Sequence, residues 1–293
     1  MEPGIGQVVL TLGDGESMPL KRDTNRLIFG GTMLQVRNER GTLVYSKIKS
    51  KEASEKIVYN TLTVPVRERF QLVLADGTKV FLNSGSEMRY PERFGKARRE
   101  VFLKGEAWFE VAKDSAREFW VHAGAMDVKV LGTSFNVKAY ERLETVATTL
   151  VEGSVEVACA GKSFQIVPGE QFVYDKNNRV MDVRMVDTES YVSWKDGYYK
   201  FRQTTLEEIM ETLSVWYGLN VFYVNESAKQ VEFTGKVKRY EDARMLLDKF
   251  EQTGDVVFDI KGNNVFITIK QKKPFAREWN SFLVKARGMV WQS

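Results

Sequence analysis

The sequence contains one cysteine, one histidine and no long apolar segment among its 293 residues. A lone cysteine excludes an internal disulfide framework, and one cysteine with one histidine cannot assemble a Cys/His zinc site. No apolar run approaches the roughly 18 to 20 residues of a membrane-spanning helix, and no signal peptide follows Met1. We therefore expect a soluble chain whose membrane anchor or targeting signal would lie outside this sequence.

Side-chain constellations for catalysis are also missing. A serine or cysteine nucleophile needs a base, but His122, the one histidine, lies in a predicted strand and is interpreted as structural. Cys159 alternates with apolar residues of another strand and is predicted to be buried and inert. Glu106 and Glu110 would lie about 13 Å apart on one strand, too far for a glycosidase pair. We expect these acids to face solvent or form ion pairs, and we predict a non-enzyme without cofactor or metal.

The net charge of +4 is concentrated at the C-terminus. Six basic residues and one acid follow residue 269, so this segment carries +5 and the remaining chain −1. A nucleic-acid-binding fold usually carries basic residues along one face, and a nearly neutral region up to residue 269 does not favour that function. Apolar residues recur at helical spacing from Phe275 to Val290, so residues 271–293 are predicted to form a basic amphipathic helix. Such a helix packs on its own domain or frays, or else binds a partner or a membrane surface.

Residues 1–185 are predicted to form a β-domain. Phe70–Leu82 contains two apolar-alternating runs around Asp76-Gly77, a strong hairpin signal. A two-residue turn would pair Leu74 with Lys79. A three-residue loop with Gly77 left-handed instead pairs Leu74 with Thr78 and places the apolar residues on one face, so we prefer it. Val8–Leu20 repeats this pattern at a shift of 62 residues.

Further short strands are predicted up to residue 157, with glycines between them. Glu100–Lys104 and Ala107–Val111, for example, are expected to be separate strands on either side of Gly105. The spacing favours an all-β unit over alternating strands and helices. The expected architecture is an antiparallel β-domain, either a jelly roll or a β-solenoid-like fold.

Residues 186–270 are predicted to form a small α+β domain. Thr205 begins a capping box, an apolar stripe follows from Leu206 to Tyr217, and Gly218 is expected to end the helix. The pattern recurs at a shift of 36 residues, with a second helix near 241–252. Two strand–helix–strand repeats are therefore expected, with both helices packed on the sheet because neither buries its stripe alone. The predicted fold class is mainly β, followed by a small α+β domain.

Several segments taken together resemble the FecR family of iron-dicitrate-sensor-like anti-sigma factors. The region from Trp194 onward is similar to the C-terminal domain of Bacteroidetes members, a relative of the short N-terminal signalling domains of secretins and TonB-dependent transporters. The resemblance runs from Gly4 to Ile269. The segments that carry it are Leu74–Asn83, Ser86–Pro91, Arg99–Lys113, Val130–Val137, Thr149–Val155, Pro168–Gln171 and Trp194–Phe201.

The resemblance implies a periplasmic sensor that is part of a transmembrane signal transducer. Such a sensor contacts the N-terminal signalling domain of a TonB-dependent outer-membrane transporter and controls an extracytoplasmic-function sigma factor. Family members also have a cytoplasmic sigma-binding segment and one membrane helix, and neither is present in this sequence. We therefore expect a periplasmic chain anchored in the inner membrane by an N-terminal helix outside it. Sigma-factor contact would run only through the missing segment, and no nucleic acid or small-molecule substrate is expected.

The expected partner contact is strand addition at an exposed sheet edge of the small domain, with aromatic anchors beside it. The candidate anchors are Tyr198, Tyr199, Phe222, Tyr223 and Phe233, and the alternative for each of them is a place in the core or on a face between packed layers. The alternative function is a carbohydrate-binding β-domain that uses Trp108, Phe109 and Trp120 as a sugar platform. Strand alternation places Trp108 and Phe109 on opposite faces, so at least one of them belongs to the core.

Overall fold

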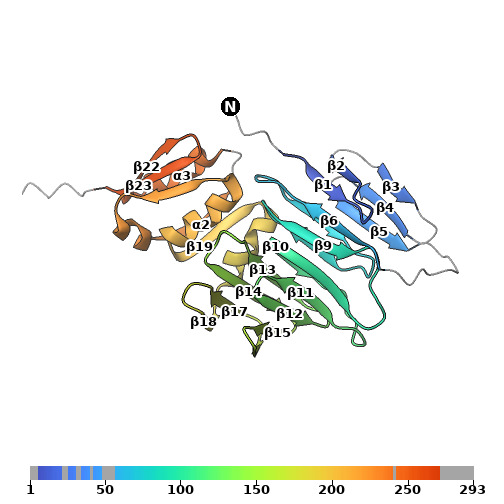
Figure 1. Cartoon of the computed structure of the whole chain (residues 1–293). Coiled ribbons are helices and arrows are strands. Elements are labelled where there is room, and N and C mark those ends of the chain that lie inside the picture. Colours follow the sequence, from blue (N-terminus) through green and yellow to red (C-terminus); the bar gives the residue numbers. More distant parts are fainter. Residues whose placement is uncertain are drawn as a thin grey trace, which may run out of the picture.

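Most of the chain forms β-strands (Figure 1). The computed structural model describes residues 6–21, 26–30, 34–39, 42–47, 57–239 and 242–270. The strands of the N-terminal part are β1 (Val8–Thr11), β2 (Ser17–Leu20), β3 (Arg26–Gly30), β4 (Leu34–Glu39), β5 (Thr42–Lys47), β6 (Tyr59–Thr63), β7 (Phe70–Val73), β8 (Lys79–Leu82), β9 (Glu87–Pro91), β10 (Arg99–Glu110), β11 (Phe119–Ala123), β12 (Met126–Val130), β13 (Ser134–Ala139), β14 (Thr145–Glu152), β15 (Val155–Cys159), β16 (Lys162–Ile166), β17 (Glu170–Asp175) and β18 (Val180–Met185).

A smaller C-terminal part mixes helices and strands. Its elements are α1 (Thr188–Val192), the 3-10 helix η1 (Ser193–Asp196), β19 (Tyr198–Thr205), α2 (Leu206–Tyr217), β20 (Asn220–Tyr223), the 3-10 helix η2 (Glu226–Gln230), β21 (Glu232–Lys238), α3 (Ala243–Glu251), β22 (Val256–Lys261) and β23 (Asn264–Ile269). We call this part the α+β region. The fold class predicted from the sequence, mainly antiparallel β followed by a small α+β region, is confirmed.

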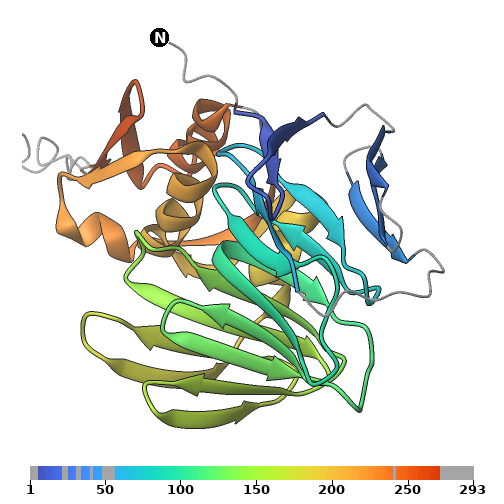
Figure 2. The same cartoon turned by 45° about the vertical axis from the view of Figure 1, so that its right-hand side comes forward.

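The strands of the N-terminal part form two sheets that share β10. Sheet A has the order β2-β1-β6-β9-β10-β11-β12-β15-β16. Sheet B has the order β3-β4-β5-β7-β8-β10-β13-β14-β17-β18. From β11 to β18, successive hairpins alternate between the two sheets and stack on one another (Figure 2), which fits the solenoid-like alternative.

The predicted register of the first hairpin is confirmed. Phe70 pairs with Leu82 and Leu72 with Val80, while the Leu74 amide donates to the Thr78 carbonyl at 2.9 Å. Gly77 has φ +90°, the left-handed conformation that the bulged loop requires. The N-terminal copy has the same geometry, because Val8 pairs with Leu20. The apolar faces of both hairpins therefore point into the core.

The region around Gly105 differs from the prediction. The two strands expected on either side of this glycine are one strand, β10. Its first half, up to Lys104, pairs in sheet A, and its second half, from Gly105, pairs in sheet B. Gly105 has φ +108°, and a Cβ there would meet the Ser86 Cα at 2.7 Å. The glycine does not end the strand; it lets the strand bend from one sheet into the other.

The space between the two sheets is filled by apolar side chains. Phe109 of sheet B contacts Phe119 of sheet A, with ring centroids 6.2 Å apart, and Phe164 contacts Phe172 at 5.1 Å in the same way. Buried residues of both sheets form one continuous hydrophobic cluster. Alternation along each strand then leaves the opposite side chains on the outer faces of the sheets.

The α+β region consists of the two predicted repeats. The strand–helix–strand unit β19-α2-β20 is followed by β21-α3-β22 and the additional strand β23. Strands β19 and β21 pair as a two-stranded sheet, and β20, β23 and β22 form a three-stranded sheet. The Glu208 amide donates to the Thr205 hydroxyl at 3.3 Å, and Gly218 has φ +68°, so both predicted ends of the first helix are confirmed.

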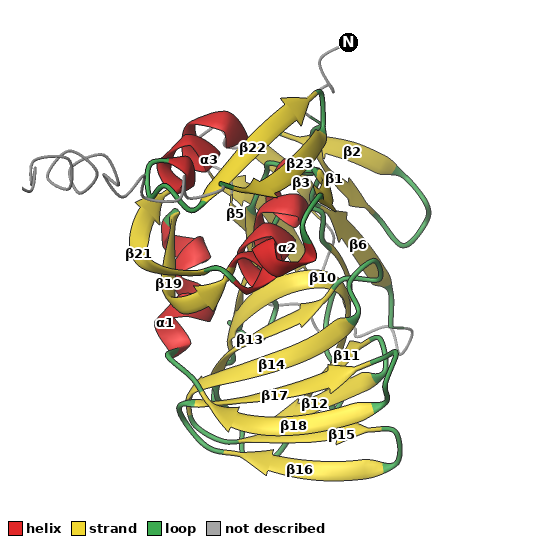
Figure 3. Ribbon diagram, turned by 90° about the vertical axis from the view of Figure 1, so that its left-hand side faces the viewer, coloured by secondary structure: helices red, strands yellow, loops and turns green. Residues whose placement is uncertain are grey.

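Both helices bury their apolar stripes against these strands, as expected. Leu213 of α2 and Leu246 of α3 belong to one cluster with Phe201, Val265 and Ile267. Figure 3 shows α2 lying next to β10, a central strand of sheet B. The C-terminal helix predicted over residues 271–293 lies outside the described residues.

Candidate functional site

The predicted aromatic anchors do not form a single surface. Tyr199 and Phe233 are 4% and 7% exposed and belong to the core of the α+β region. Tyr198 and Tyr223 are half-buried, with the ammonium groups of Lys236 and Lys229 lying 3.6 and 5.3 Å from their ring centroids. Phe222 is 47% exposed and stacks on Phe266 with centroids 5.1 Å apart. Phe222 is therefore the anchor candidate with an open surface, and the contact itself stays a prediction.

Strand β20 is an edge of the three-stranded sheet. Among the described strands, β23 is its only neighbour. The Asn220 amide donates to the carbonyl of Asn263, just before β23, at 2.8 Å, and the Val224 amide donates to the Ile267 carbonyl of β23 at 2.9 Å. Because successive amides of a strand point to opposite sides, the amides of Val221 and Tyr223 point away from β23. This edge offers donors and acceptors to an incoming strand, and it contains neither proline nor a charged residue.

The opposite edge of the same sheet, β22, is better protected. The Phe258 amide donates to the Glu251 side chain at 2.5 Å, and α3 packs along the strand. Asp259 and Lys261 also place charges on β22 and pair with each other at 2.9 Å. Side-chain capping and charge are devices that prevent strand addition. The two edges of this sheet therefore differ in their capacity to accept a partner strand.

The outer face of sheet B carries the α+β region. Trp108 of β10 is 4% exposed and packs into the hydrophobic cluster of that region. The Trp194 indole donates to Asn136 Oδ1 at 3.3 Å. The Arg67 amide donates to the Trp216 carbonyl at 3.0 Å, and this carbonyl also accepts from Ser84 Oγ at 3.2 Å. Apolar and polar contacts together fix α2 against sheet B.

Glu106 lies inside this junction, which corrects the expectation of a solvent-facing or ion-paired acid. Its carboxylate accepts from Asn83 Nδ2 at 2.8 Å and from Asn136 Nδ2 at 2.9 Å. Burial raises its pKa, although the ammonium of Lys138 and these two amides act in the opposite direction. Glu110, in contrast, forms the expected ion pair with Lys79 at 3.6 Å.

Lys138 connects the sheet to α2. Its ammonium is 2.9 Å from Glu211 Oε2. Burial acts to lower the pKa of Lys138, but the carboxylates of Glu211 and Glu106 outweigh it and raise the pKa. The lysine is therefore held in its charged form. The sequence did not predict this trio of Glu106, Lys138 and Glu211, because its members come from distant segments. A lysine on the outer face of a strand is ordinarily expected to be exposed to solvent.

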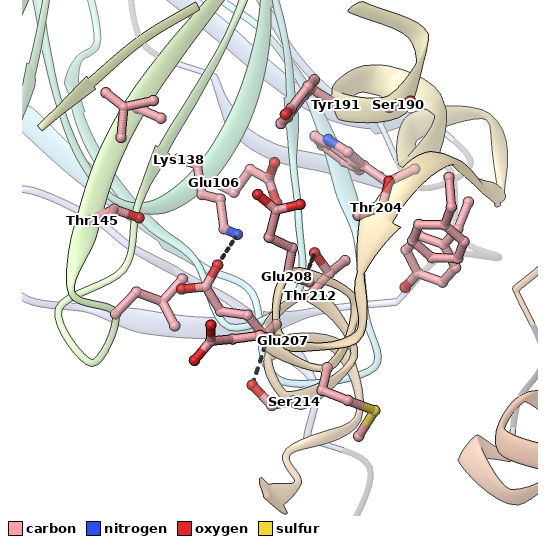
Figure 4. Close-up of a pocket in the computed structure, with 18 of the residues that line it drawn as sticks. Glu106, Lys138, Thr145, Ser190, Tyr191, Thr204, Glu207, Glu208, Thr212 and Ser214 are labelled. Atoms are coloured by element: carbon pink, nitrogen blue, oxygen red, sulfur yellow. Dashed lines mark hydrogen bonds and ion pairs between the residues drawn. The ribbon is translucent and has the colours of Figure 1, made fainter. Parts of the chain in front are cut away.

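Beside this trio lies a cleft of ≈ 620 Å³ between sheet B and the α+β region. Figure 4 shows Lys138 and Thr145 on the sheet side of the cleft, Tyr191 from α1 and Glu207 and Glu208 from α2. Polar groups thus surround a space to which both parts of the chain contribute.

The predicted sugar platform is not present. Phe109 is fully buried between the sheets, and Trp108 is buried on the opposite side of β10, so Trp120 alone keeps a partly exposed ring. His122 has a structural environment as expected, with Nδ1 2.7 Å from Asp127 Oδ1 and its ring stacked on Phe102. Cys159 is buried, and burial raises the pKa of its thiol. Within the described ranges, no three His, Cys, Asp or Glu residues are grouped as metal ligands.

Comparisons with known proteins agree with this architecture. Two family models match the chain, FecR protein over residues 60–156 and FecR, C-terminal, over residues 198–267. Two crystal structures of a protein assigned as an anti-sigma factor from Parabacteroides distasonis ATCC 8503 are similar, each with a TM-score of 0.65. Their identities are 28% and 27%, covering 71% and 72% of this chain and 98% and 99% of the other chain. No match was found among curated proteins.

None of the helices in the described ranges has the length and apolarity to cross a membrane. The two family models follow each other in the order of the β-sheet region and the α+β region, and together they match more than half of the sequence. The chain belongs to the FecR family, whose members are anti-sigma factors that act in signal transduction.

Proposed function

We propose that this chain is the periplasmic sensor part of a FecR-type signal transducer that controls an extracytoplasmic-function sigma factor. In this proposal it receives its signal by adding a strand of the N-terminal signalling domain of a TonB-dependent transporter to β20. The observation that carries the proposal is the open, uncharged edge of β20 next to the exposed ring of Phe222. Main-chain hydrogen bonds at such an edge supply affinity, and side chains next to it supply specificity.

The apolar surface beside the edge supports this assignment. Phe222 and Val224 alternate onto the same face of the three-stranded sheet, and both side chains are exposed. Aromatic anchors near the centre of an interface contribute most of the binding free energy. A partner strand paired with β20 would bring its own side chains onto Phe222. In this proposal the edge of β20 pairs with the partner strand, and the ring of Phe222 beside it anchors the partner's side chains.

A regulatory role without catalysis is consistent with the environments of the titratable groups. Glu106 is engaged by two amides, and His122 is engaged by Asp127 and Phe102. The FecR family is regulatory, which supports the same conclusion. We accordingly propose protein–protein contact as the mechanism of this chain.

The test is binding of the full chain to purified N-terminal signalling domains of the transporters encoded beside its gene. Isothermal titration calorimetry is expected to detect a complex with at least one of them. Phe222→Lys is expected to weaken it about 30-fold, the loss typical of an interface hot spot. Val257→Lys introduces the same charge on the protected β22 edge and is expected to bind like the wild type. Absence of binding to every domain, or equal effects of the two variants, would contradict the proposal.

Hydrogen exchange distinguishes strand addition from other contacts. In the complex, the amides of Val221 and Tyr223 are expected to become protected, because they would donate to the added strand. The amides of β22 are expected to keep the exchange rates of the free protein. Protection at β22 alone would assign the contact to the other edge.

The proposed location is tested in intact cells. Protease added to spheroplasts is expected to digest the native protein, because a periplasmic domain is accessible once the outer membrane is removed. Digestion that requires lysis of the inner membrane would overturn this part of the proposal.

A further inference from the structure

The floor of the cleft between sheet B and the α+β region has a polar row and an apolar strip. Gln171 Nε2 donates to Thr149 Oγ1 at 2.8 Å, and Arg184 Nη2 donates to Gln171 Oε1 at 3.4 Å. In the adjacent row, Ala147 of β14 pairs with Val173 of β17. All of these residues line the cleft. A sugar ring has the same two kinds of surface, a rim of hydroxyl groups and faces of C–H groups.

The two lysines that line the cleft are already paired. Lys138 forms its ion pair with Glu211, and Lys200 lies 2.5 Å from Glu189 Oε2 and 3.0 Å from Asp187 Oδ2. Arg142 and Arg184 also line the cleft, but so do the carboxyl groups of Glu106, Glu144, Glu207, Glu208 and Glu211, so the charges of the lining nearly cancel. The chemistry of the cleft therefore favours a neutral ligand.

Two buried hydroxyl groups at the cleft have no hydrogen-bond partner among the described residues. They belong to Tyr199 of β19 and Ser190 of α1, and both residues line the cleft. Tyr199 is 4% exposed, so bulk water does not solvate its hydroxyl group. A buried donor without an acceptor is costly, and a hydroxyl group can both donate and accept. A ligand rich in hydroxyl groups supplies the missing partners, directly or through a bridging water.

We propose that this cleft binds a neutral carbohydrate of mono- or disaccharide size. Its volume of ≈ 620 Å³ lies within the range of small-molecule pockets. The ring would rest on Ala147 and Val173, with Tyr191 of α1 beside it and the row of Thr149 and Gln171 along its rim. The molecule is bound and not converted, and Val221 and Tyr223 of β20 are also among the residues that line this cleft.

Because both parts of the chain line the cleft, a bound sugar stabilises their junction. Ligands that bind only the folded state raise the unfolding temperature by mass action. The full chain is titrated with cellobiose, maltose and chitobiose as neutral probes, and with glycylglycine and glucose 6-phosphate as zwitterionic and anionic probes. Calorimetry and thermal unfolding are expected to detect at least one neutral sugar and neither charged probe.

Two cleft variants locate the site. Ser190→Ala removes one unpaired hydroxyl group and is expected to weaken sugar binding about tenfold, the effect of one lost hydrogen bond. Thr145→Trp places a large side chain on the lining of the cleft and is expected to abolish binding. Ser163→Ala and Ser163→Trp, on the exposed strand β16, are the matched controls and are expected to bind like the wild type.

The outcomes separate clearly. Ser190→Ala removes a hydroxyl group that has no hydrogen-bond partner among the described residues, so it is expected to keep the fold and remains informative even if Thr145→Trp unfolds. The proposal is overturned if no neutral sugar binds, if a charged probe binds in place of the sugars, or if Ser190→Ala binds the sugar with unchanged affinity.

Discussion

Glu106 and Lys138 occupy directly opposite positions on β10 and β13, yet Lys138 forms its ion pair with Glu211 of α2, at 2.9 Å. The carboxylate of Glu106 is instead held by the side-chain amides of Asn83 and Asn136. Lys138 and Glu106 could have formed a cross-strand ion pair. Instead, Lys138 links sheet B to α2, about 70 residues further along the chain.

Removal of the acid in this connection is expected to destabilise the protein. Glu211→Gln should lower the free energy of unfolding by roughly 1.5 kcal/mol, because Lys138 loses a charged acceptor at a partly buried position. Urea unfolding of the wild type, Glu211→Gln, Lys138→Met and the double variant gives the coupling energy. Lys79→Met breaks the exposed pair with Glu110 and is expected to change the stability little. A coupling energy near zero would show that the ion pair contributes nothing.

Glu106 should make stability depend on pH. Burial raises its carboxyl pKa, so the folded state holds this proton more tightly than the unfolded chain. The contribution of Glu106 to stability is therefore present at low pH and declines as pH rises from about 4.5 through the raised pKa. Glu106→Gln does not titrate, so its stability relative to the wild type is expected to grow across that window. Unfolding temperatures measured from acid to neutral pH test this, with Glu110→Gln as the surface control. A constant difference would contradict it.

Trp108 is expected to be the main apolar contact of sheet B with the α+β region. Trp108→Ala should cost roughly 3–5 kcal/mol, as buried tryptophan truncations do, because the indole is 4% exposed in the junction cluster. Trp120→Ala, on the outer face of sheet A, removes a half-buried ring that contacts Lys129 and should cost much less. Denaturant unfolding followed by circular dichroism compares the two. Similar losses would mean that the junction contributes no more than a surface position.

Gly105 is expected to tolerate no side chain. Gly105→Ala combines a φ of +108° with a Cβ that would meet Ser86 Oγ at 2.4 Å, so both conformation and space oppose it. Gly161→Ala has φ +78° but nothing within 4 Å, and isolates the conformational cost, roughly 1 kcal/mol. Thermal unfolding should show a clearly larger loss for Gly105→Ala. An equal loss would indicate that β10 and Ser86 move apart easily.

Local patterns were sufficient for the hairpins and helix ends. Asp76-Gly77 and the alternation around it led to the register that places Leu72 opposite Val80. Thr205 and Gly218 marked the ends of α2 because capping depends on residues within one turn of the helix. The repeat at a shift of 36 residues also led to the correct order of elements in the α+β region.

Long-range packing produced the features that local patterns missed. Gly105 looked like a strand boundary, because a glycine between two apolar runs gives the same local signal whether the strand ends or bends there. Glu106 looked solvated, because burial of an acid depends on the helix that covers it and on the amides of Asn83 and Asn136. Tyr199 and Phe222 looked equivalent, and their different burial follows from which face of each strand meets the helices.

Composition and short-range periodicity were enough to identify an antiparallel β-fold with a repeated α+β region, since turns, caps and alternation act over a few residues. The junction of Trp108, Glu106, Lys138 and Glu211, the cleft beside it and the open edge of β20 depend on how sheet B and α2 meet. These contacts join residues that are far apart in sequence, so their geometry is set by the packing of complete elements and leaves no signature in any single segment.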